Sequence, residues 1–320
     1  MTAMCLVHVV AAPRVLMRHL LTLFDWSTDT IHDVYARSAA LKEAFGRGER
    51  LERHPRRVCA LLFEKPSLRT RVSFEAAMTH LGGSTLYLGN DVGWGQRESI
   101  ADFAAVLGNY VDVVVCRAFA HERVELLAQH SAAPVINGLT DSFHPCQALA
   151  DLFTLQEHFG SLEGITLAYV GDANNVARSL AICCARLSVR FRLASPKPYQ
   201  FDEPFLERLR EIFPEWRLEQ TEDPCVAVSE AHAVYTDVWA SMGQEDEREM
   251  RRRAFQPYQV NQSLMEAAPP HAVFMHCLPA HRGEEVTDEV IDGARSIVLV
   301  QAENRMHVQK GILDRILGAG

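Results

Sequence analysis

Short apolar runs and longer segments of helical spacing alternate along the whole chain. The clearest run is Val58–Phe63, which contains no charged or hydroxyl side chain. Runs of this length are typical of buried strands. We predict strands at 58–63, 85–88, 111–116 and 134–137 in the first half, and at 165–170, 190–194, 234–237, 272–276 and 296–301 in the second.

Helical patterns fill the intervals between these strands. Ser27 or Thr28 caps the first long helix, and Gly82-Gly83 stops the helix after the first strand. Strands that alternate with helices form parallel sheets, so the fold class is α/β, with two domains that each have a central parallel sheet flanked by helices. The expected helices are 18–23, 28–45, 68–81, 99–110, 122–130, 144–158, 176–187, 203–213 and 304–317.

The length of 320 residues suits two domains, each able to bury its own core. We expect a first domain at 1–147, a second at 148–302, and a C-terminal helix at 303–320 that folds back onto the first. The helix that begins near 144 would join the two domains. Residues 1–16 are expected to be a loose lead, because they lack the basic start and long apolar core of a signal peptide. Met17 is then an alternative start to Met1.

The stretch after the first predicted strand indicates an anion site. Pro66 keeps Lys65 out of the helical conformation, so Ser67 can cap the helix that follows. Free backbone N–H groups at this helix start, with the side chains of Arg69 and Thr70, can converge on one spot. Phosphate is the natural guest of such a site. The alternative is a strand–helix junction with solvated charges.

A second arginine follows the third predicted strand. Arg117 comes directly after 111–116, as Arg69 comes shortly after 58–63. The carboxyl ends of parallel strands lie along one edge of a sheet, so both arginines can face one crevice. The glycine-rich loop 89–98 lies between them in sequence, and we expect it to be mobile and functional.

The second half opens with a turn that resembles a dinucleotide-binding turn. Gly171–Val176 follows a strand and begins a helix, but it lacks the second and third glycines of that fingerprint. Nucleotide binding is therefore not expected. Asn174 and Asn175 suit hydrogen bonds to a small polar substrate, and simple turn and capping chemistry is an equal alternative.

Two later strand ends carry polar or reactive side chains. Asp237 suits a cationic substrate group, or else the N-cap of a following helix. Cys277 could be a nucleophile, a polar contact or a core thiol. His276 and His281 are five positions apart, which is the wrong spacing for two zinc ligands on one helix face, so no metal site is predicted.

The composition and charge of the chain exclude some classes of binding partner. The net charge of -9 argues against nucleic acid, whose phosphates would be repelled. No apolar run is long enough to cross a membrane. The eight cysteines form no CxxC pair, which favours reduced thiols and a cytoplasmic protein.

Four segments in order carry a family resemblance. They are Phe63–Glu75, His144–Gln147, Asp237–Gly243 and His276–Pro279. With them the chain resembles the aspartate/ornithine carbamoyltransferase family from about Arg18 to its end. The Ser-Met-Gly and His-Cys-Leu-Pro sequences within the last two segments resemble the ornithine branch of that family.

The resemblance implies a reaction and a set of site residues. The side-chain amine of L-ornithine would attack carbamoyl phosphate, giving L-citrulline and phosphate, and no metal or organic cofactor is required. The implied carbamoyl-phosphate site comprises Ser67, Leu68 through its N–H, Arg69, Thr70, Arg117, His144, Gln147, Cys277, Leu278 and Arg305. The implied ornithine site comprises Asn175, Asp237, Ser241 and Met242. The implied catalytic residues are Arg69, Arg117, His144, Asp237 and Cys277.

The resemblance also implies a homotrimer, or a multiple of trimers, in arginine metabolism, with biosynthetic and catabolic directions both open. A related transferase for another amine or an acylated ornithine is one alternative. A catalytically silent binding subunit is another, although such a protein would have lost Arg69, His144 or Cys277, and all three are present. The chain departs from the family pattern at Leu68, at Ala173, and at Gly93 in the loop that reaches a neighbouring subunit in relatives.

Overall fold

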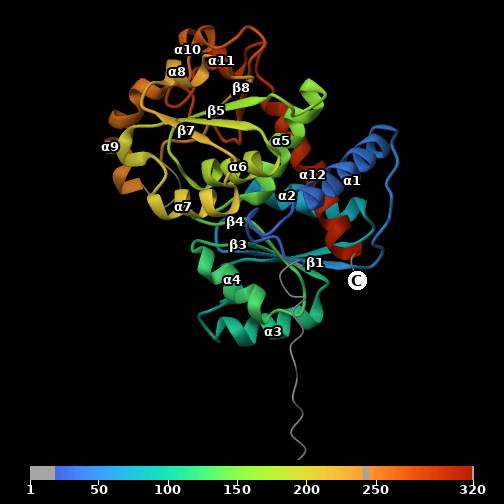
Figure 1. The fold of residues 1–320 in the computed structure, drawn as a ribbon. Helices are drawn as coiled ribbons and strands as arrows, with labels where there is room; N and C mark the ends of the chain where they lie inside the picture. Colours follow the sequence, from blue (N-terminus) through green and yellow to red (C-terminus); the bar gives the residue numbers. More distant parts are fainter. Residues whose placement is uncertain (1–18, 241–244, 319–320) are drawn as a thin grey trace, which may run out of the picture.

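The computed structural model describes residues 19–240 and 245–318. It contains two all-parallel sheets, one with strand order β2-β1-β3-β4 and one with order β7-β6-β5-β8-β9. Figure 1 shows the two sheets in separate lobes, each with helices packed around it. The predicted α/β class with a parallel sheet in each half is confirmed.

The first sheet lies in the lobe built from the first half of the chain. Its strands are β1 (Val58–Phe63), β2 (Ser84–Leu88), β3 (Val113–Arg117) and β4 (Val135–Leu139). The second sheet contains β5 (Thr166–Val170), β6 (Arg190–Ala194), β7 (Leu218–Thr221), β8 (Ala233–Thr236) and β9 (Val273–His276).

Long helices cover the faces of the two sheets. In the first half they are α1 (Thr28–Gly46), α2 (Leu68–His80), α3 (Ile100–Tyr110), α4 (His121–His130) and α5 (Pro145–Phe159). In the second half they are α6 (Asn175–Arg186), α7 (Glu203–Ile212), α8 (Pro224–Val228), α9 (Arg248–Phe255), α10 (Gln262–Ala267), α11 (Asp288–Ile291) and α12 (Val298–Gly318). None of the described helices is both long and apolar enough to span a membrane.

Successive side chains of each strand lie on opposite faces of its sheet and pack into two different hydrophobic cores. In β1, Leu61 packs into a core shared with the second lobe, whereas Leu62 faces α3 and α4. In β5, Leu167 belongs to the same shared core, whereas Ala168 faces the helices on the far side of the second sheet. This period of two is what a strand buried on both faces requires.

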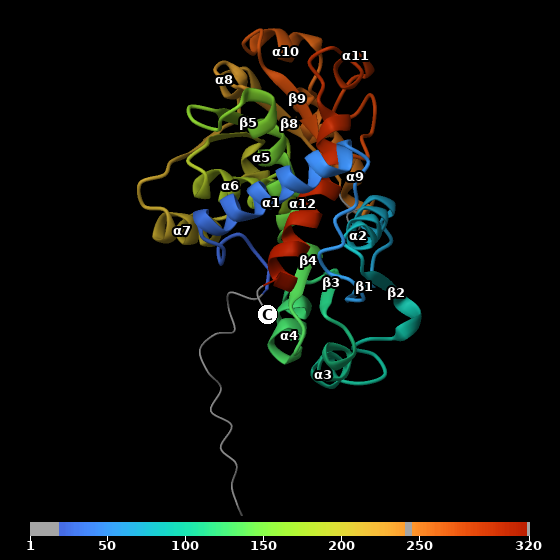
Figure 2. The same cartoon turned by 90° about the vertical axis from the view of Figure 1, so that its right-hand side faces the viewer.

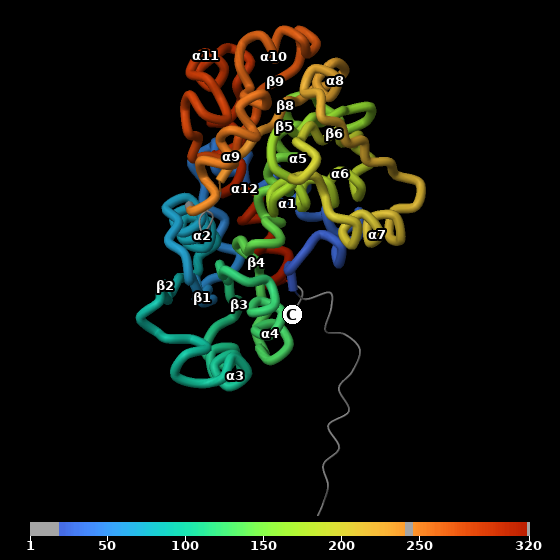
Figure 3. Tube along the Cα trace, turned by 90° about the vertical axis from the view of Figure 1, so that its left-hand side faces the viewer, coloured from blue at the N-terminus to red at the C-terminus, as the bar shows by residue number. Residues whose placement is uncertain are grey.

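Helices α5 and α12 lie inside the shared core and bind the lobes together. Leu149 of α5 and Ile312 of α12 belong to the same buried cluster as Leu61 and Leu167. Figure 2 shows α12 running from the second lobe to the first, beside α1, and Figure 3 shows α3 and α4 on the side of the first sheet away from the second lobe. Gly311 permits the close crossing of α12 and α1, because a Cβ there would lie 2.2 Å from the hydroxyl oxygen of Ser38.

Two predicted elements are wrong. Residues 19–23 are not helical; Leu20 instead lies beside β4, donating to the carbonyl of Val135 at 2.9 Å and accepting from the N–H of Asn137 at 2.7 Å. The predicted strand 296–301 is a single bridge at Ser296 followed by the start of α12. The edge strand β7 was not predicted, because its residues Leu-Glu-Gln-Thr are mostly polar and only partly buried.

A buried carboxylate fixes the C-terminal helix to the first lobe. Asp314 of α12 accepts hydrogen bonds from Arg37 of α1 at 2.9 Å and from Arg53 at 2.7 Å, and it contacts His54 at 3.0 Å. Burial alone would raise the pKa of Asp314, but its hydrogen bonds and charged partners outweigh burial and lower the pKa to about 2.

We predict that Asp314→Asn lowers the free energy of unfolding by about 2 kcal/mol at pH 7, because a depressed pKa is a stabilising contribution of about 1.4 kcal/mol per unit. The contribution is present above the unfolded pKa, near 4, and is lost as the pH falls through about 2. Denaturant unfolding from pH 7 down to pH 3 measures this, with Glu203→Gln in the exposed Glu203–Arg210 pair as a control that changes little. A deficit that did not shrink at low pH would contradict the ion-pair explanation.

Candidate active site

In each sheet the strand order reverses direction once, and a crevice is expected at the strand ends beside that reversal. In the first sheet the chain moves from β1 outward to β2 and returns to β3 on the other side of β1; in the second sheet the same reversal occurs between β5 and β8. Ligands of parallel sheets bind outside the carboxyl ends of the strands at such reversals. Here the two crevices open into a single cleft of about 990 Å³ between the lobes.

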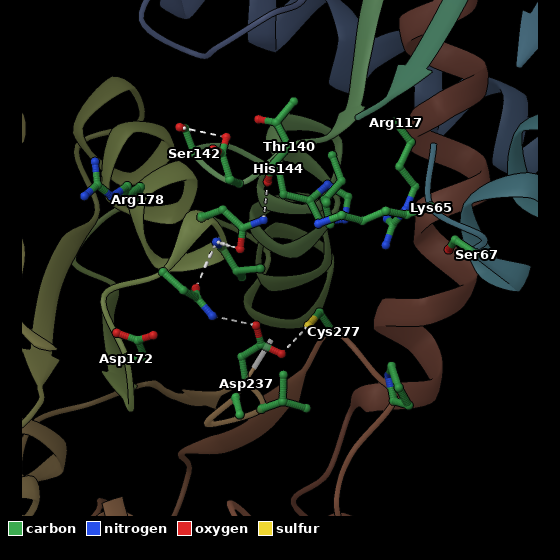
Figure 4. Close-up of a pocket in the computed structure, with 18 of the residues that line it drawn as sticks. Lys65, Ser67, Arg117, Thr140, Ser142, His144, Asp172, Arg178, Asp237 and Cys277 are labelled. Carbon is green, nitrogen blue, oxygen red and sulfur yellow. Dashed lines mark hydrogen bonds between the residues drawn. The ribbon is translucent and has the colours of Figure 1, made fainter. Parts of the chain in front are cut away.

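Side chains from both lobes face each other across this cleft. Figure 4 shows Arg117 and Ser67 from the first lobe on one side, and Asp237 with Cys277 from the second lobe on the other. The first side is cationic and the second carries a carboxylate. The cleft therefore offers an anion site and a cation site within one cavity.

The anion side begins at the first turn of α2. Ser67 is extended and caps the helix, accepting the N–H of Thr70 at 3.3 Å. The side chain of Leu68 is 76% exposed, so at this position the helix start offers only its backbone N–H. Arg69 also lines the cleft and makes no hydrogen bond or ion pair with the described residues. This is the geometry of a phosphate site at a helix N-terminus.

A local irregularity in the sheet aims the second arginine. The pairing of β3 with β4 shifts between Cys116 and Arg117, so that Arg117 pairs with Leu139 and Gly138 is the extra residue. A Cβ on Gly138 would lie 3.3 Å from the carbonyl oxygen of Cys116, which favours glycine at this bulge. Bulges of this kind redirect a side chain next to a site, and Arg117 is buried in the cleft wall.

The third arginine comes from α12. Arg305 donates to the carbonyl oxygen of Gln147 at 2.7 Å and to the hydroxyl of Thr70 at 3.0 Å, and both acceptors are neutral. Burial, together with the charges of Arg305 and Arg69, lowers the pKa of Arg117 to about 10. Within the described residues no carboxylate pairs with any of the three guanidinium groups. The cluster stays cationic at neutral pH and lacks a counter-ion, so an anionic guest would stabilise it.

His144 precedes α5 at the back of the cationic side. Its backbone N–H donates to the hydroxyl of Ser179 on α6 at 2.7 Å. Burial, Arg305 and Arg117 hold the pKa of His144 well below its ordinary value. A neutral imidazole is therefore placed among cations, where it can share a hydrogen bond with a carbonyl group without adding charge.

The opposite side is organised around Asp237, just after β8. One carboxylate oxygen accepts from the amide of Asn174 at 2.9 Å, and the other accepts from the thiol of Cys277 at 3.1 Å. Burial and the charge of Asp237 raise the pKa of Cys277 well above its ordinary value. The thiol is consequently protonated at neutral pH and acts as a hydrogen-bond donor, which disfavours the nucleophile interpretation.

The turn after Cys277 is held by a buried histidine. Leu278 adopts a left-handed conformation with φ 56°, and its N–H donates to Nδ1 of His276 at 2.8 Å. Nε2 of His276 contacts the buried carboxylate of Glu285 at 3.2 Å. His276 therefore supports the backbone at Leu278, and Leu278 faces the cleft.

Comparisons with known proteins agree with this geometry. The sequence model of the aspartate/ornithine carbamoyltransferase carbamoyl-P binding domain matches residues 18–157, and that of the Asp/Orn binding domain matches residues 163–316. The chain belongs to the aspartate/ornithine carbamoyltransferase family. The first match covers β1 to β4, and the second covers β5 to β9 together with most of α12.

Individual relatives extend over nearly the whole chain. The ornithine carbamoyltransferase of Bacillus subtilis is 47% identical, and the match covers 98% of each protein. That of Anoxybacillus flavithermus is 48% identical over 94% of this chain and 96% of the relative. The solved ornithine carbamoyltransferase of Pyrococcus furiosus superposes with a TM-score of 0.91 at 46% identity, covering 95% of this chain and 98% of that one.

Most of the residues implied by the family motifs lie on the cleft. The cleft lining includes Ser67, Leu68, Arg69, Thr70, Arg117, His144, Asn175, Asp237, Cys277, Leu278 and Arg305. Gln147 is the exception, since it lies behind the cleft wall and holds Arg305. Ser241 and Met242 are outside the described residues, as is the start of the chain up to residue 18.

Three polar contacts of the site were not predicted. Asn174 caps α6 through its side-chain oxygen, as the capping alternative expects, but the hydrogen bond from its amide to Asp237 was not expected. Asn175 donates to the carbonyl of Thr140 in the other lobe at 2.6 Å. Asp172 pairs with Arg251 at 2.7 Å at the mouth of the cleft. Their strand-end positions gave a general signal, but no sequence spacing identifies these pairs.

The fold also gathers two groups of possible metal ligands that the sequence spacing did not reveal. Their ligand atoms lie within 4.8 Å of one another in Asp237, His276 and Cys277, and in His281, Glu284 and Glu285. In each group the side chains already have protein partners, such as the Cys277 thiol on Asp237 and Arg248 on Glu284. We therefore assign no ion to either group.

We predict that the His144 ring does not titrate between pH 6 and pH 8, because burial and two arginines oppose its protonation. Nitrogen-15 NMR of histidine-labelled protein measures this, and His144→Gln identifies the resonances. Free histidine in the same buffer titrates near pH 6.5 and serves as the reference. A midpoint of the His144 resonances near 6.5 would contradict the described environment.

Proposed function

We propose that this chain transfers the carbamoyl group of carbamoyl phosphate to the side-chain amine of L-ornithine, producing L-citrulline and phosphate. The observation that carries the proposal is the cluster of Arg69, Arg117 and Arg305 near the start of α2, which no described carboxylate pairs with and which faces Asp237 across one cleft. The relatives named above as ornithine carbamoyltransferases support the choice of both substrates.

The cationic side suits the donor. The phosphate of carbamoyl phosphate would accept N–H groups from the first turn of α2 and the guanidinium of Arg69. Its carbonyl oxygen would lie towards Arg117, His144 and Arg305, with Gln147 keeping Arg305 in place. Charge that grows on the carbonyl oxygen during attack would be stabilised by donors already in position.

The opposite side suits the acceptor. Asp237 would bind a cationic amino group of ornithine, and Asn175, Ser241 and Met242 would complete its site. The neutral side-chain amine forms the new C–N bond, the C–O bond to phosphate breaks, and the amine proton leaves with the phosphate. Burial between the lobes holds the two reactants together and limits hydrolysis of the donor by water.

We expect citrulline to form with ornithine and carbamoyl phosphate, and little ureido product to form with putrescine, N-acetylornithine or aspartate. Aspartate has no side-chain amine, and N-acetylornithine has no free α-amino group for the carboxylate of Asp237. Putrescine has two amines but lacks the α-carboxylate of ornithine. Colorimetric detection of ureido product with purified protein measures this. Absence of citrulline would refute the proposal, and preference for N-acetylornithine would favour the acylated-substrate alternative.

Asp237→Asn in the same assay separates the two sides of the cleft. It should reduce kcat/KM for ornithine by about 100-fold, the loss expected when a charged partner worth about 3 kcal/mol is removed. The dependence on carbamoyl phosphate should change little. The matched control is Asp172→Asn, since that carboxylate pairs with Arg251 rather than facing Cys277.

We extend the proposal to organisation and location. We assign the carbamoyl-phosphate-binding domain to 1–147, the ornithine-binding domain to 148–302 and a C-terminal segment to 303–320; the described part of that segment, in α12, packs on the first lobe. We place the protein in the cytoplasm because all cysteines in the described residues are free thiols. We also propose a homotrimer, supported by exposed apolar side chains on the edge strand β2 and on α3, namely Leu86, Tyr87, Val106 and Tyr110.

The assembly state is measured by sedimentation velocity. We expect three times the chain mass of 35.9 kDa for the wild-type protein. Tyr110→Glu should weaken assembly by placing a charge on the apolar surface of α3. Val226→Glu, at an exposed residue of α8 in the second lobe, is the control. A stable monomer of wild type would contradict the trimer.

A further inference from the structure

A buried carboxylate lies behind the cleft wall and forms no ion pair with any residue that the structure describes. Asp151 is on α5 and is fully buried. One of its oxygens accepts from the side-chain amides of Gln147 at 2.8 Å and Gln301 at 2.7 Å, and the other accepts from the hydroxyl of Tyr235 at 3.1 Å. These three donors are neutral and come from three elements: α5, α12 and β8.

The carboxylate determines which way both glutamines face. A carboxamide has a donor end and an acceptor end, whereas an ionised carboxylate only accepts. Because both N–H groups point to Asp151, the oxygen of Gln147 is directed at Arg305, which donates to it at 2.7 Å. For the same reason the oxygen of Gln301 accepts the backbone N–H of His276 at 3.0 Å, one residue before Cys277.

We propose that Asp151 is a positioning residue that orients Gln147 and Gln301, and through them fixes the guanidinium of Arg305 and the backbone that leads to Cys277. We call these two connections the arms of the network: the Gln147 arm ends at Arg305 on the carbamoyl-phosphate side of the cleft, and the Gln301 arm ends at the backbone beside Cys277 and Asp237 on the other side. This role deepens the proposed carbamoyl transfer and rests on it.

Burial opposes ionisation of this residue. It raises the pKa of Asp151 to about 7, against lowering by its three hydrogen-bond donors and by Arg305. A raised carboxyl pKa means that the contribution of this group to stability is full below about pH 4 and is lost as the pH rises through 7. Ionising this carboxyl group therefore costs stability, a cost that its hydrogen bonds offset in part. The other titratable groups around Asp151 are Tyr35, Tyr235, Cys183, Cys184 and Cys277.

Two substitutions separate orientation from charge. Asp151→Asn places an amide oxygen where both glutamines donate and an NH₂ where Tyr235 can accept, so both orientations persist and most of kcat is retained. Asp151→Leu removes the carboxylate that both glutamines share; Gln147 loses its acceptor, and Gln301 keeps only the hydroxyl of Tyr235 at 3.2 Å. We expect kcat to fall by about 100-fold in the leucine variant, the size of loss that a misplacement of about 1 Å produces.

The control is Thr154→Val, one turn along the same helix. Thr154 is also buried, and its hydroxyl donates to the carbonyl of Ala150 at 2.7 Å and accepts from Asn304 at 3.0 Å rather than bonding to Asp151. A double-mutant cycle with Gln147→Met tests the route: if Asp151 acts through Gln147, the loss in the double variant is much smaller than the two separate losses combined. Full additivity, or equal losses for Asp151→Leu and Thr154→Val, would overturn the proposal.

Binding of carbamoyl phosphate without ornithine gives a readout that does not depend on turnover. Calorimetry should show about tenfold weaker binding in Asp151→Leu and near-normal binding in Asp151→Asn, because only the latter keeps Gln147 oriented towards Arg305, although Thr70 contacts Arg305 in both. Unchanged binding in both would sink the inference even if the wild type makes citrulline. Absence of citrulline from wild type would refute the proposed function, while the binding result would still decide the role of Asp151. If the leucine variant does not fold, Gln301→Met removes the second arm alone and should lower kcat; normal kcat there would equally refute the role.

Discussion

Three guanidinium groups share one wall of the cleft, where none of the carboxylates at 19–240 and 245–318 pairs with them, and much of the fold serves to hold them there. Arg69 comes from the first turn of α2, Arg117 from a bulged strand and Arg305 from the last helix. Burial, followed by the charges of Arg305 and Arg69, lowers the pKa of Arg117. Such a cluster persists only where packing fixes its members, and that packing is supplied by the core that α5 and α12 share with both sheets.

The same packing explains why a residue from the far end of the chain completes the first lobe's pocket. Helix α12 begins beside β9, crosses the shared core and ends at the Asp314 network on the first lobe. Arg305 lies between these two ends, where the helix passes the start of α2. The two lobes are therefore not independent units joined by a linker, because one helix contributes to the core of both and to the site between them.

Sequence reasoning was strongest where local chemistry decides the structure. Ser67 caps α2 as its position after Pro66 predicts, and the alternating pattern located eight of the nine strands that the structure describes. Contacts between residues that are distant in sequence could not be predicted from local patterns. The local sequence around Leu20 predicts a helix, whereas in the fold Leu20 pairs with β4. Residues 296–301 are apolar enough for a strand, but only Ser296 forms a bridge and α12 begins at Val298. Gln147 and Asp151 are simply one helical turn apart in sequence, and only the fold brings Gln301 and Tyr235 to them.

The placement of negative charge completes the electrostatic argument. A carboxylate in direct contact with Arg305 would satisfy the guanidinium and remove much of its attraction for a substrate anion. In this structure Gln147 stands between Arg305 and Asp151, so the charge of Asp151 is near enough to favour the ionised arginine against burial but does not pair with it. Across the cleft, Asn174 and the protonated Cys277 occupy the oxygens of Asp237 with neutral donors in the same manner. Both charges are held by neutral hydrogen bonds, which leaves each available to a group of opposite charge on a substrate.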